Sequence, residues 1–120
     1  MAKLIDFPTF SDDRGYLTVI EKFFDCDIKR IYYIYGADSQ VRGGHRHKKT
    51  KQILIAVSGS CGIYSETPML KETFFLNTPQ KGLLLEPEDW HTMQNFSENC
   101  VLLVLASEYY DKDDYIDERY

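Results

Sequence analysis

The sequence is divided into short runs of leucine, β-branched and aromatic residues, each bounded by glycine, proline, aspartate, asparagine or serine. Runs of this length between turn-forming residues are typical of strands. The expected strands cover residues 17–20, 31–35, 53–57, 62–64, 73–76, 83–85 and 101–106. No window combines a helical period with caps at both ends, and only 109–120 is expected to hold a turn of helix. We therefore predict one domain, residues 1–120, with an all-β antiparallel sandwich or barrel fold.

Two of the runs, 53–57 and 101–105, are apolar at every position and do not alternate with polar residues. Such strands are typically buried on both faces. In a protein of two sheets this requires a cover over the outer face of one sheet. We expect that cover to be a second subunit, and hence a homodimer.

The charge is uneven along the chain. Asp and Glu total 19 against 14 Lys and Arg, a net charge of −5, which argues against a general nucleic-acid-binding protein. Yet five of the 14 basic residues lie between Arg42 and Lys51, where there is no acidic residue. This basic segment predicts a local anionic ligand.

The cysteines and the termini indicate the compartment. Cys26, Cys61 and Cys100 are odd in number and match neither a CxxC nor a zinc pattern, so we interpret them as free thiols. The N-terminus lacks the apolar run of a signal peptide, and the longest apolar stretch, 101–106, is too short to cross a bilayer. We expect a soluble cytoplasmic protein without membrane contact.

Two histidines lie within the basic segment. His45 and His47 are separated by one residue, so on a strand both side chains point to the same face, and Arg46 points to the other. The spacing HxH-x4-Q-x6-G, ending at Gln52 and Gly59, resembles the first motif of the cupins, in which a carboxylate normally stands at the Gln52 position. A neutral amide is a weaker ligand for a divalent ion. We therefore expect a metal-free site, although three imidazoles alone can hold zinc. The alternative is a pair of surface histidines.

A closer resemblance rests on several segments together. They are 28–35 (IKRIYYIY), 42–48 (RGGHRHK), Gly59-Ser60-Cys61, Gly82-Leu83, 90–93 (WHTM), 95–97 (NFS), 104–111 (VLASEYYD) and 114–116 (DYI). Over residues 13–115 the chain resembles the sugar 3,4-ketoisomerases that act on dTDP-4-oxo-6-deoxy-D-glucose, relatives of the dTDP-sugar epimerases. One departure is Arg46, where that family usually has a small residue.

The resemblance implies a cupin (jelly-roll) antiparallel β-barrel, and a homodimer that exchanges an N-terminal strand. It implies an isomerase that exchanges the C4 ketone and the C3 hydroxyl through an enediol. The product, a dTDP-3-oxo-6-deoxyhexose, would serve 3-amino-3,6-dideoxyhexose and polysaccharide biosynthesis. No cofactor is expected, because no hydride leaves the substrate and no glycine-rich dinucleotide loop is present.

Three residues are assigned to catalysis on this resemblance. His47 is expected to be the general base, with His45 as the second acid or base. Tyr33 is expected to give its hydroxyl to the sugar oxygens, with a core aromatic residue as the alternative.

Four residues are assigned to substrate binding. Arg42 suits the pyrophosphate, because a guanidinium matches phosphate oxygens. Lys49 would assist, the alternative being a solvated strand charge, and Arg14 is either a substrate ligand or an ordinary turn cation. His91 is expected to face the cavity. In the family, the residues matching Arg14 and His91 bear on the face of C4 that is protonated, and this pair favours the galacto-configured product.

Three other functions remain open at this stage. They are a dTDP-sugar 3,5-epimerase, a non-catalytic sugar-nucleotide-binding cupin and a metal-dependent cupin oxygenase, which Gln52 disfavours. The acidic residues from Asp111 to Asp114 are interpreted as a solvated tail, because they lack calcium-loop spacing. Trp90 is expected to pack in the core.

Overall fold

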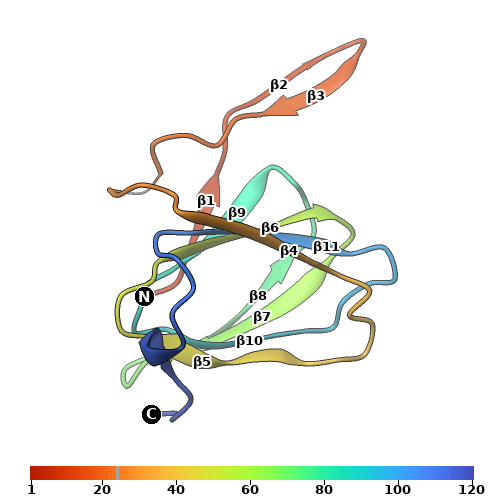
Figure 1. Ribbon diagram of the computed structural model, residues 1–120. Helices are drawn as coiled ribbons and strands as arrows, with labels where there is room; N and C mark the ends of the chain where they lie inside the picture. The colour runs from red at the N-terminus through yellow and green to blue at the C-terminus, as the bar shows by residue number, and fades with distance from the viewer. Residues whose placement is uncertain (24) are drawn as a thin grey trace.

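The structure, a computed structural model, describes residues 1–23 and 25–120. Two five-stranded antiparallel sheets face one another, and a two-stranded hairpin projects away from them (Figure 1). The first sheet contains, in spatial order, β1 (Lys3–Asp6), β9 (Lys81–Leu85), β6 (Gln52–Ser58), β11 (Val101–Ala106) and β4 (Arg30–Tyr35). The second contains β12 (Tyr115–Ile116), β5 (Arg42–His47), β10 (Trp90–Gln94), β7 (Cys61–Glu66) and β8 (Lys71–Leu76). The prediction of an all-β antiparallel fold is confirmed.

The remaining elements lie at the two ends of the chain. The projecting hairpin is formed by β2 (Thr9–Asp12) and β3 (Gly15–Thr18). A 3₁₀ helix, η1 (Lys112–Asp114), precedes β12, which agrees with the helical turn expected in 109–120. Within residues 1–23 and 25–120, no helix is long and apolar enough to cross a membrane.

The space between the sheets is filled by alternate residues of the central strands. Leu54 and Ala56 of β6 meet Leu102 and Val104 of β11, in register across the two strands, with Ile63 of β7 opposite. All five side chains are buried. Because side chains alternate along a strand, the intervening residues of β6 and β11 must face the outside of the first sheet.

That outer face is also buried in part, but by the chain itself. Ile53, Ile55 and Leu105 form a second apolar cluster with Phe7, and Phe23 packs on Phe7 edge to face at 4.9 Å between ring centroids. The prediction that 53–57 is buried on both faces is therefore correct for Ile53–Ala56, while Val57 is exposed. The segment before β4 supplies the cover here that we had expected from a second subunit.

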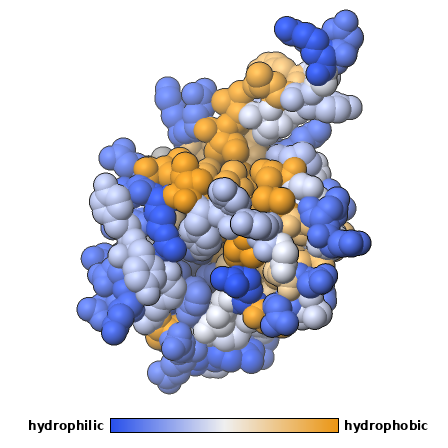
Figure 2. Space-filling model, turned by 45° about the vertical axis from the view of Figure 1, so that its right-hand side comes forward, coloured by the Kyte–Doolittle hydropathy of each residue, from blue (hydrophilic) through white to orange (hydrophobic). Residues whose placement is uncertain are grey.

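The rest of the outer face remains open. Ile31, Tyr33 and Tyr35 of β4 are exposed, as are Phe10 and Leu17 of the projecting hairpin. Figure 2 shows apolar side chains gathered on the projecting hairpin and on the body beneath it. An exposed apolar surface of this kind is typical of a protein–protein contact.

Several strands differ from their predicted bounds. The run expected at 17–20 forms β3 two residues earlier, and β1, β2, β5, β10 and β12 were not predicted. These strands are short or carry charged and glycine residues, so their extended conformation depends on pairing with neighbours more than on local preference. The three cysteines have free thiols, as expected.

Candidate active site

Three histidines and a tyrosine meet at one end of the barrel. The ring centroids of His45 and His47 lie 5.1 Å apart, and the His91 ring lies 5.1 Å from His45. Tyr115 of β12 packs against both His45 and His47, at 4.6 Å in each case. The chain thus brings together strands β12, β5 and β10, which are neighbours in the second sheet. Figure 1 shows β5 and β10 at the end of the barrel near the C-terminus.

The strand that carries His45 and His47 has two glycines directly after its first residue, Arg42. Gly43 and Gly44 have φ angles of +84° and +82°, which glycine adopts without steric cost. A Cβ at Gly43 would lie 2.9 Å from the carbonyl oxygen of His91, so the close approach of β5 and β10 also requires glycine. The pairing is irregular here, between His91 and Thr92. The two glycines therefore lie within β5, where His45 is opposite His91.

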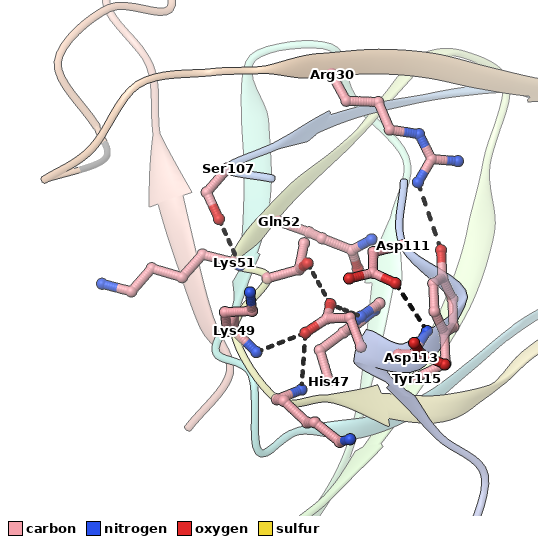
Figure 3. Close-up of polar contacts among 12 residues, drawn as sticks. Arg30, His47, Lys49, Lys51, Gln52, Ser107, Asp111, Asp113 and Tyr115 are labelled. Carbon is pink, nitrogen blue, oxygen red and sulfur yellow. Dashed lines mark hydrogen bonds and ion pairs between the residues drawn. The ribbon is translucent and has the colours of Figure 1, made fainter. Parts of the chain in front are cut away.

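His47 is hydrogen-bonded to a carboxylate. Its ring nitrogen Nδ1 lies 2.9 Å from Oδ2 of Asp114, which also accepts the hydroxyl of Thr50. The other oxygen, Oδ1, accepts the backbone N–H groups of Lys48 and Lys49 at 3.1 and 2.7 Å. Figure 3 shows these contacts around His47, close to Lys49 and Tyr115. Because the carboxylate accepts at Nδ1, the proton of neutral His47 is held there and Nε2 keeps its lone pair.

Both members of this pair are buried, with 3% and 4% of the side chain exposed. Burial favours the neutral form of Asp114, but hydrogen bonds from Thr50, the Lys49 amide and His47 outweigh it and hold the pKa of Asp114 below its usual value. Burial also favours the neutral form of His47, which lowers its pKa, and the Asp114 carboxylate opposes that decrease. Asp114 is thus an anion that partly restores the basicity of a buried imidazole.

The other two histidines have lost more of their basicity. Burial, together with the neighbouring His47, lowers the pKa of His45 to about 4. Burial lowers the pKa of His91 to about 3, although its Nδ1 lies 3.1 Å from the carbonyl oxygen of Asp89. All three imidazoles are therefore neutral at pH 7 and able to accept a proton.

Burial of neutral histidines has a consequence for stability. As the pH falls below 6.5, the unfolded chain takes up protons that folded His47 and His91 bind only at lower pH. We therefore expect the free energy of unfolding to be greatest above pH 6.5 and to decrease steadily below it. Urea unfolding between pH 7.5 and 5 measures this, and His91→Asn should give a shallower decrease. A free energy of unfolding that rises below pH 6.5 would contradict it.

A cleft of about 220 Å³ opens beside the histidines. It is lined by Arg30, Tyr32, Ile34, Arg42, Gly43, His45, Met93 and Tyr115. Nη1 of Arg30 reaches the Tyr115 hydroxyl at 3.4 Å, as Figure 3 shows, and its guanidinium lies over the Tyr32 ring at 4.5 Å. Two arginines and no acidic side chain line the cleft, so its charge favours an anionic ligand.

The tyrosine assigned to catalysis faces the wrong way. Tyr33 is 61% exposed on the outer face of β4, whereas the barrel-facing residues of that strand are Arg30, Tyr32 and Ile34. Tyr32 lines the cleft, and its hydroxyl accepts a hydrogen bond from Nε2 of Gln52 at 3.1 Å. Adjacent tyrosines on a strand face opposite sides, so within one chain Tyr32 lines this cleft and Tyr33 does not.

Of the four residues assigned to substrate binding, only Arg42 lines the cleft of its own chain. His91, with 1% exposed, lies behind the cleft against His45. Lys49 contributes its backbone N–H to Asp114, and its exposed side chain does not line the cleft. Arg14 lies at the tip of the projecting hairpin, where it pairs with Asp12, far from the histidines of the same chain (Figure 1).

Sequence reasoning missed Asp114. We interpreted 111–114 as a solvated acidic tail, but only Asp111 and Asp113 are exposed, and Asp114 is buried against His47. The spacing of acids within the segment carried no sign of this, because the contact spans 67 residues of sequence. A weak signal was the apolar pair that follows, Tyr115-Ile116, which forms β12 and draws the segment into the second sheet.

Residues 1–23 and 25–120 contain no group of three or more histidine, cysteine or carboxylate side chains arranged to hold a metal ion. The position at which a metal-binding cupin has a carboxylate is occupied by Gln52, whose Nε2 is engaged by Tyr32.

Two facing antiparallel sheets, with an HxH pair on one strand and a third histidine on its neighbour, define a protein of the cupin class. Within it, the chain belongs to the family described as "FdtA: WxcM-like, C-terminal", which matches residues 1–120.

Proteins with named activities match most of this chain and most of their own length. The chain is 42% identical over 117 residues to the TDP-4-oxo-6-deoxy-α-D-glucose-3,4-oxoisomerase of Aneurinibacillus thermoaerophilus, covering 95% of this chain and 84% of that protein. It is 46% identical to a histidine-to-asparagine variant of the 3,4-ketoisomerase QdtA of Thermoanaerobacterium thermosaccharolyticum, crystallised with TDP-4-keto-6-deoxyglucose. That match has a TM-score of 0.91 and covers 98% and 87% of the two chains. The WlaRB TDP-quinovose 3,4-ketoisomerase of Campylobacter jejuni is 40% identical, with a TM-score of 0.92 and coverage of 98% and 92%.

Proposed function

We propose that this chain is a TDP-sugar 3,4-ketoisomerase acting on TDP-4-oxo-6-deoxy-D-glucose. The observation that carries the proposal is the buried His47–Asp114 pair beside His45 and an arginine-lined cleft, in a chain 42% identical to a 3,4-oxoisomerase of that sugar. A neutral imidazole held by a carboxylate is suited to remove a proton next to a carbonyl. The cleft charge suits the diphosphate of a sugar nucleotide.

The reaction can be followed atom by atom. Nε2 of His47 removes the proton from C3, and the C4 carbonyl oxygen becomes a hydroxyl as the C3–C4 enediol forms. His45, which faces the cleft, helps to move the proton between O3 and O4. A proton is then returned to C4, leaving the ketone at C3. No electron leaves the sugar, so the step balances without an external oxidant or reductant.

The remaining roles follow from the cleft. The Tyr32 hydroxyl is placed to hydrogen-bond a sugar oxygen, taking the role first assigned to Tyr33. Arg42 and Arg30 would contact phosphate oxygens, since neither pairs with a carboxylate among the described residues. His91 packs against His45, and Lys49 adds an exposed positive charge two residues after His47. We further propose the galacto-configured product and a cytoplasmic location.

Isotope exchange tests the proposal. Protein dialysed exhaustively against EDTA is incubated with TDP-4-oxo-6-deoxyglucose in deuterated water, and the sugar is followed by NMR. A 3-oxo product carrying deuterium at C4 is expected, and its C4 configuration tests the stereochemical assignment. Deuterium at C3 and C5 without ketone transfer would indicate a 3,5-epimerase instead, and binding without turnover would indicate a sugar-nucleotide-binding protein. Loss of turnover with EDTA, restored by a metal, would overturn the metal-free site.

The two adjacent tyrosines give a matched pair of variants. Tyr32→Phe removes a hydroxyl in the cleft and is expected to reduce kcat/KM by about tenfold or more, which corresponds to one hydrogen bond of about 1.4 kcal/mol. Tyr33→Phe removes a hydroxyl on the opposite face and is expected to leave kcat/KM unchanged. Steady-state assays of both variants compare them directly. A larger loss for Tyr33→Phe would restore the original assignment.

We also propose that the protein is a homodimer. The exposed apolar residues of β4 and of the hairpin provide a surface for a second copy, and the hairpin projects far enough from its own body to reach one. Arg14 would then bind substrate in the site of the partner.

Mixing of two inactive variants tests this arrangement. His47→Asn and Arg14→Ala are each expected to lose activity, and subunit exchange between them should restore part of it. One site of the mixed dimer then combines an intact His47 with an intact Arg14 from the other copy. A protein that sediments as a monomer, or a mixture that stays inactive while mixed dimers form, would contradict the proposal.

A further inference from the structure

Arg46, the residue between the two catalytic histidines, is not used by the cleft. It is bound instead to the residues that follow β12. Its Nε donates to the backbone oxygen of Glu118 at 3.2 Å, and its Nη1 donates to the Tyr120 hydroxyl at 3.1 Å. The guanidinium also lies over the Tyr120 ring, 4.3 Å from the centroid. Arg46 therefore joins β5 to residues 117–120, which we call the C-terminal strap.

A second arginine fastens the strap more firmly. Nε and Nη2 of Arg119 donate to the two carboxylate oxygens of Glu66, each at 2.9 Å. The Glu66 side chain is only 2% exposed, and it also accepts the Tyr64 hydroxyl at 2.7 Å. The Arg119 guanidinium stacks over Trp90 at 4.5 Å. A two-point ion pair with a buried carboxylate is a strong and directional contact.

Two further hydrogen bonds complete the attachment. Nε1 of Trp90 donates to the backbone oxygen of Asp117 at 3.0 Å, and the Tyr120 hydroxyl donates to that of Glu88 at 2.7 Å. The strap is thus bound to β5, β7, the β9–β10 turn and β10. None of its residues lines the cleft.

The strap continues directly from the residues that support the histidines. β12 pairs with β5 so that Tyr115 lies opposite His47 and Ile116 opposite Arg46, and Asp114 immediately precedes this pair. One residue of a strand spans about 3.3 Å, and a hydrogen bond weakens beyond about 3.2 Å, so a small shift of β12 would break the contact between Asp114 and His47. A two-residue strand is too short to hold that position alone.

We propose that Arg119 and Arg46 are positioning residues of the ketoisomerase: through the C-terminal strap they hold Asp114 and Tyr115 against His47. The activity part of this inference rests on the proposed function. Neither arginine touches the substrate, so their effect passes through the strap. Loosening the strap should reduce catalysis more than binding, because Arg30 and Arg42 of the cleft are on other strands.

The test compares five variants. Arg119→Ala removes the ion pair, and Arg119→Lys keeps the charge without the two-point geometry. Glu66→Gln/Arg119→Gln removes both charges, so that no unpaired carboxylate stays buried if Arg119→Ala fails to fold. Arg46→Ala removes the second attachment point. The control, Lys81→Ala, removes an exposed lysine that lies 3.8 Å from Asp6 on the other sheet.

Two readouts are measured on each variant. The first is steady-state kinetics: kcat should fall by about tenfold in Arg119→Ala, with KM nearly unchanged and partial recovery in Arg119→Lys. The second is NMR of ¹⁵N-labelled histidine, which reports the Nδ1 proton and the pKa of His47 without substrate. His47 is faced by Asp114, His45, His91, Tyr115 and the charge of Arg30. Of these only Asp114 raises its pKa, so loss of the contact should lower that pKa further.

Arg46→Ala should change both readouts in the same direction by a smaller amount, and Lys81→Ala should change neither. Folded Arg119→Ala or Glu66→Gln/Arg119→Gln protein with an unaltered His47 spectrum and unaltered kcat would overturn the inference. If the strap variants change the His47 spectrum but the wild-type protein itself shows no turnover, then the strap positions His47 and the proposed function is wrong.

Discussion

Replacement of His47 by asparagine is expected to reduce turnover of TDP-4-oxo-6-deoxyglucose by about 10²–10⁴-fold, the range that one positioned general base contributes. The asparagine amide can still donate to Asp114, so the carboxylate stays paired and the fold is retained. What is lost is the basic Nε2 that accepts the C3 proton. The measurement is kcat with NMR detection of the product, alongside the melting temperature of the variant.

Lys48→Asn is the matched control, because Lys48 is the next residue and its side chain is exposed. It should turn over at the wild-type rate. If His47→Asn kept wild-type activity while His45→Asn lost it, the base would be His45, which faces the cleft more directly. The pH dependence tests whether the base is a buried histidine. Because the pKa of His47 is lowered by burial, the acid limb of kcat/KM in the wild type should lie below 6.5, the value of a free histidine.

Asp114→Asn is expected to have the second largest effect, acting on both rate and stability. The amide removes the charge that opposes the decrease in the pKa of His47, so the imidazole becomes a weaker base in a less defined tautomer. We expect the plateau of kcat to fall by at least about tenfold, and the acid limb to move to lower pH. A pH–rate profile with both features would be hard to obtain by partial unfolding, which lowers the plateau alone.

The stability effect of the same variant has a separate cause. Asp114 accepts two backbone N–H groups and the Thr50 hydroxyl in a buried position, and the amide group can satisfy only some of these donors. Each donor left unpaired costs about 1–3 kcal/mol, so the free energy of unfolding should fall measurably in urea. Asp113→Asn, an exposed neighbour on the same 3₁₀ helix, should change neither rate nor stability. Equal losses in the two variants would place the effect in the helix rather than in the contact with His47.

The site shows how the protein keeps an imidazole basic without exposing it. Burial, together with the neighbouring histidines, lowers the pKa of His45 to about 4 and that of His91 to about 3. His47, equally enclosed, has a carboxylate on Nδ1 that offsets part of the same effect. Of the three histidines, the one with the carboxylate is therefore best suited to accept a proton at neutral pH.

The sequence by itself determined the features that depend on local periodicity. Short runs of β-forming residues between turns indicate an all-β fold, and the one-residue spacing of His45 and His47 places both rings on one face, where they meet at 5.1 Å. The apolar run 53–57 correctly indicated a strand with two buried faces over most of its length. Each of these follows from the alternation of side chains along a strand, which needs no knowledge of what packs on it.

Only the tertiary structure decided what depends on partners distant in sequence. Alternation does not say which of Tyr32 and Tyr33 faces inward, because both phases of the strand carry apolar residues; packing against β11 and Gln52 selects Tyr32. In the sequence Asp114 cannot be distinguished from its exposed acidic neighbours. The pairing of β12 with β5 brings its carboxylate to Nδ1 of His47. Arg14 resembled a residue of the same site, yet its hairpin projects away from it. A strand pattern therefore assigns residues to faces, whereas the pairing of strands far apart in the chain determines which charges meet.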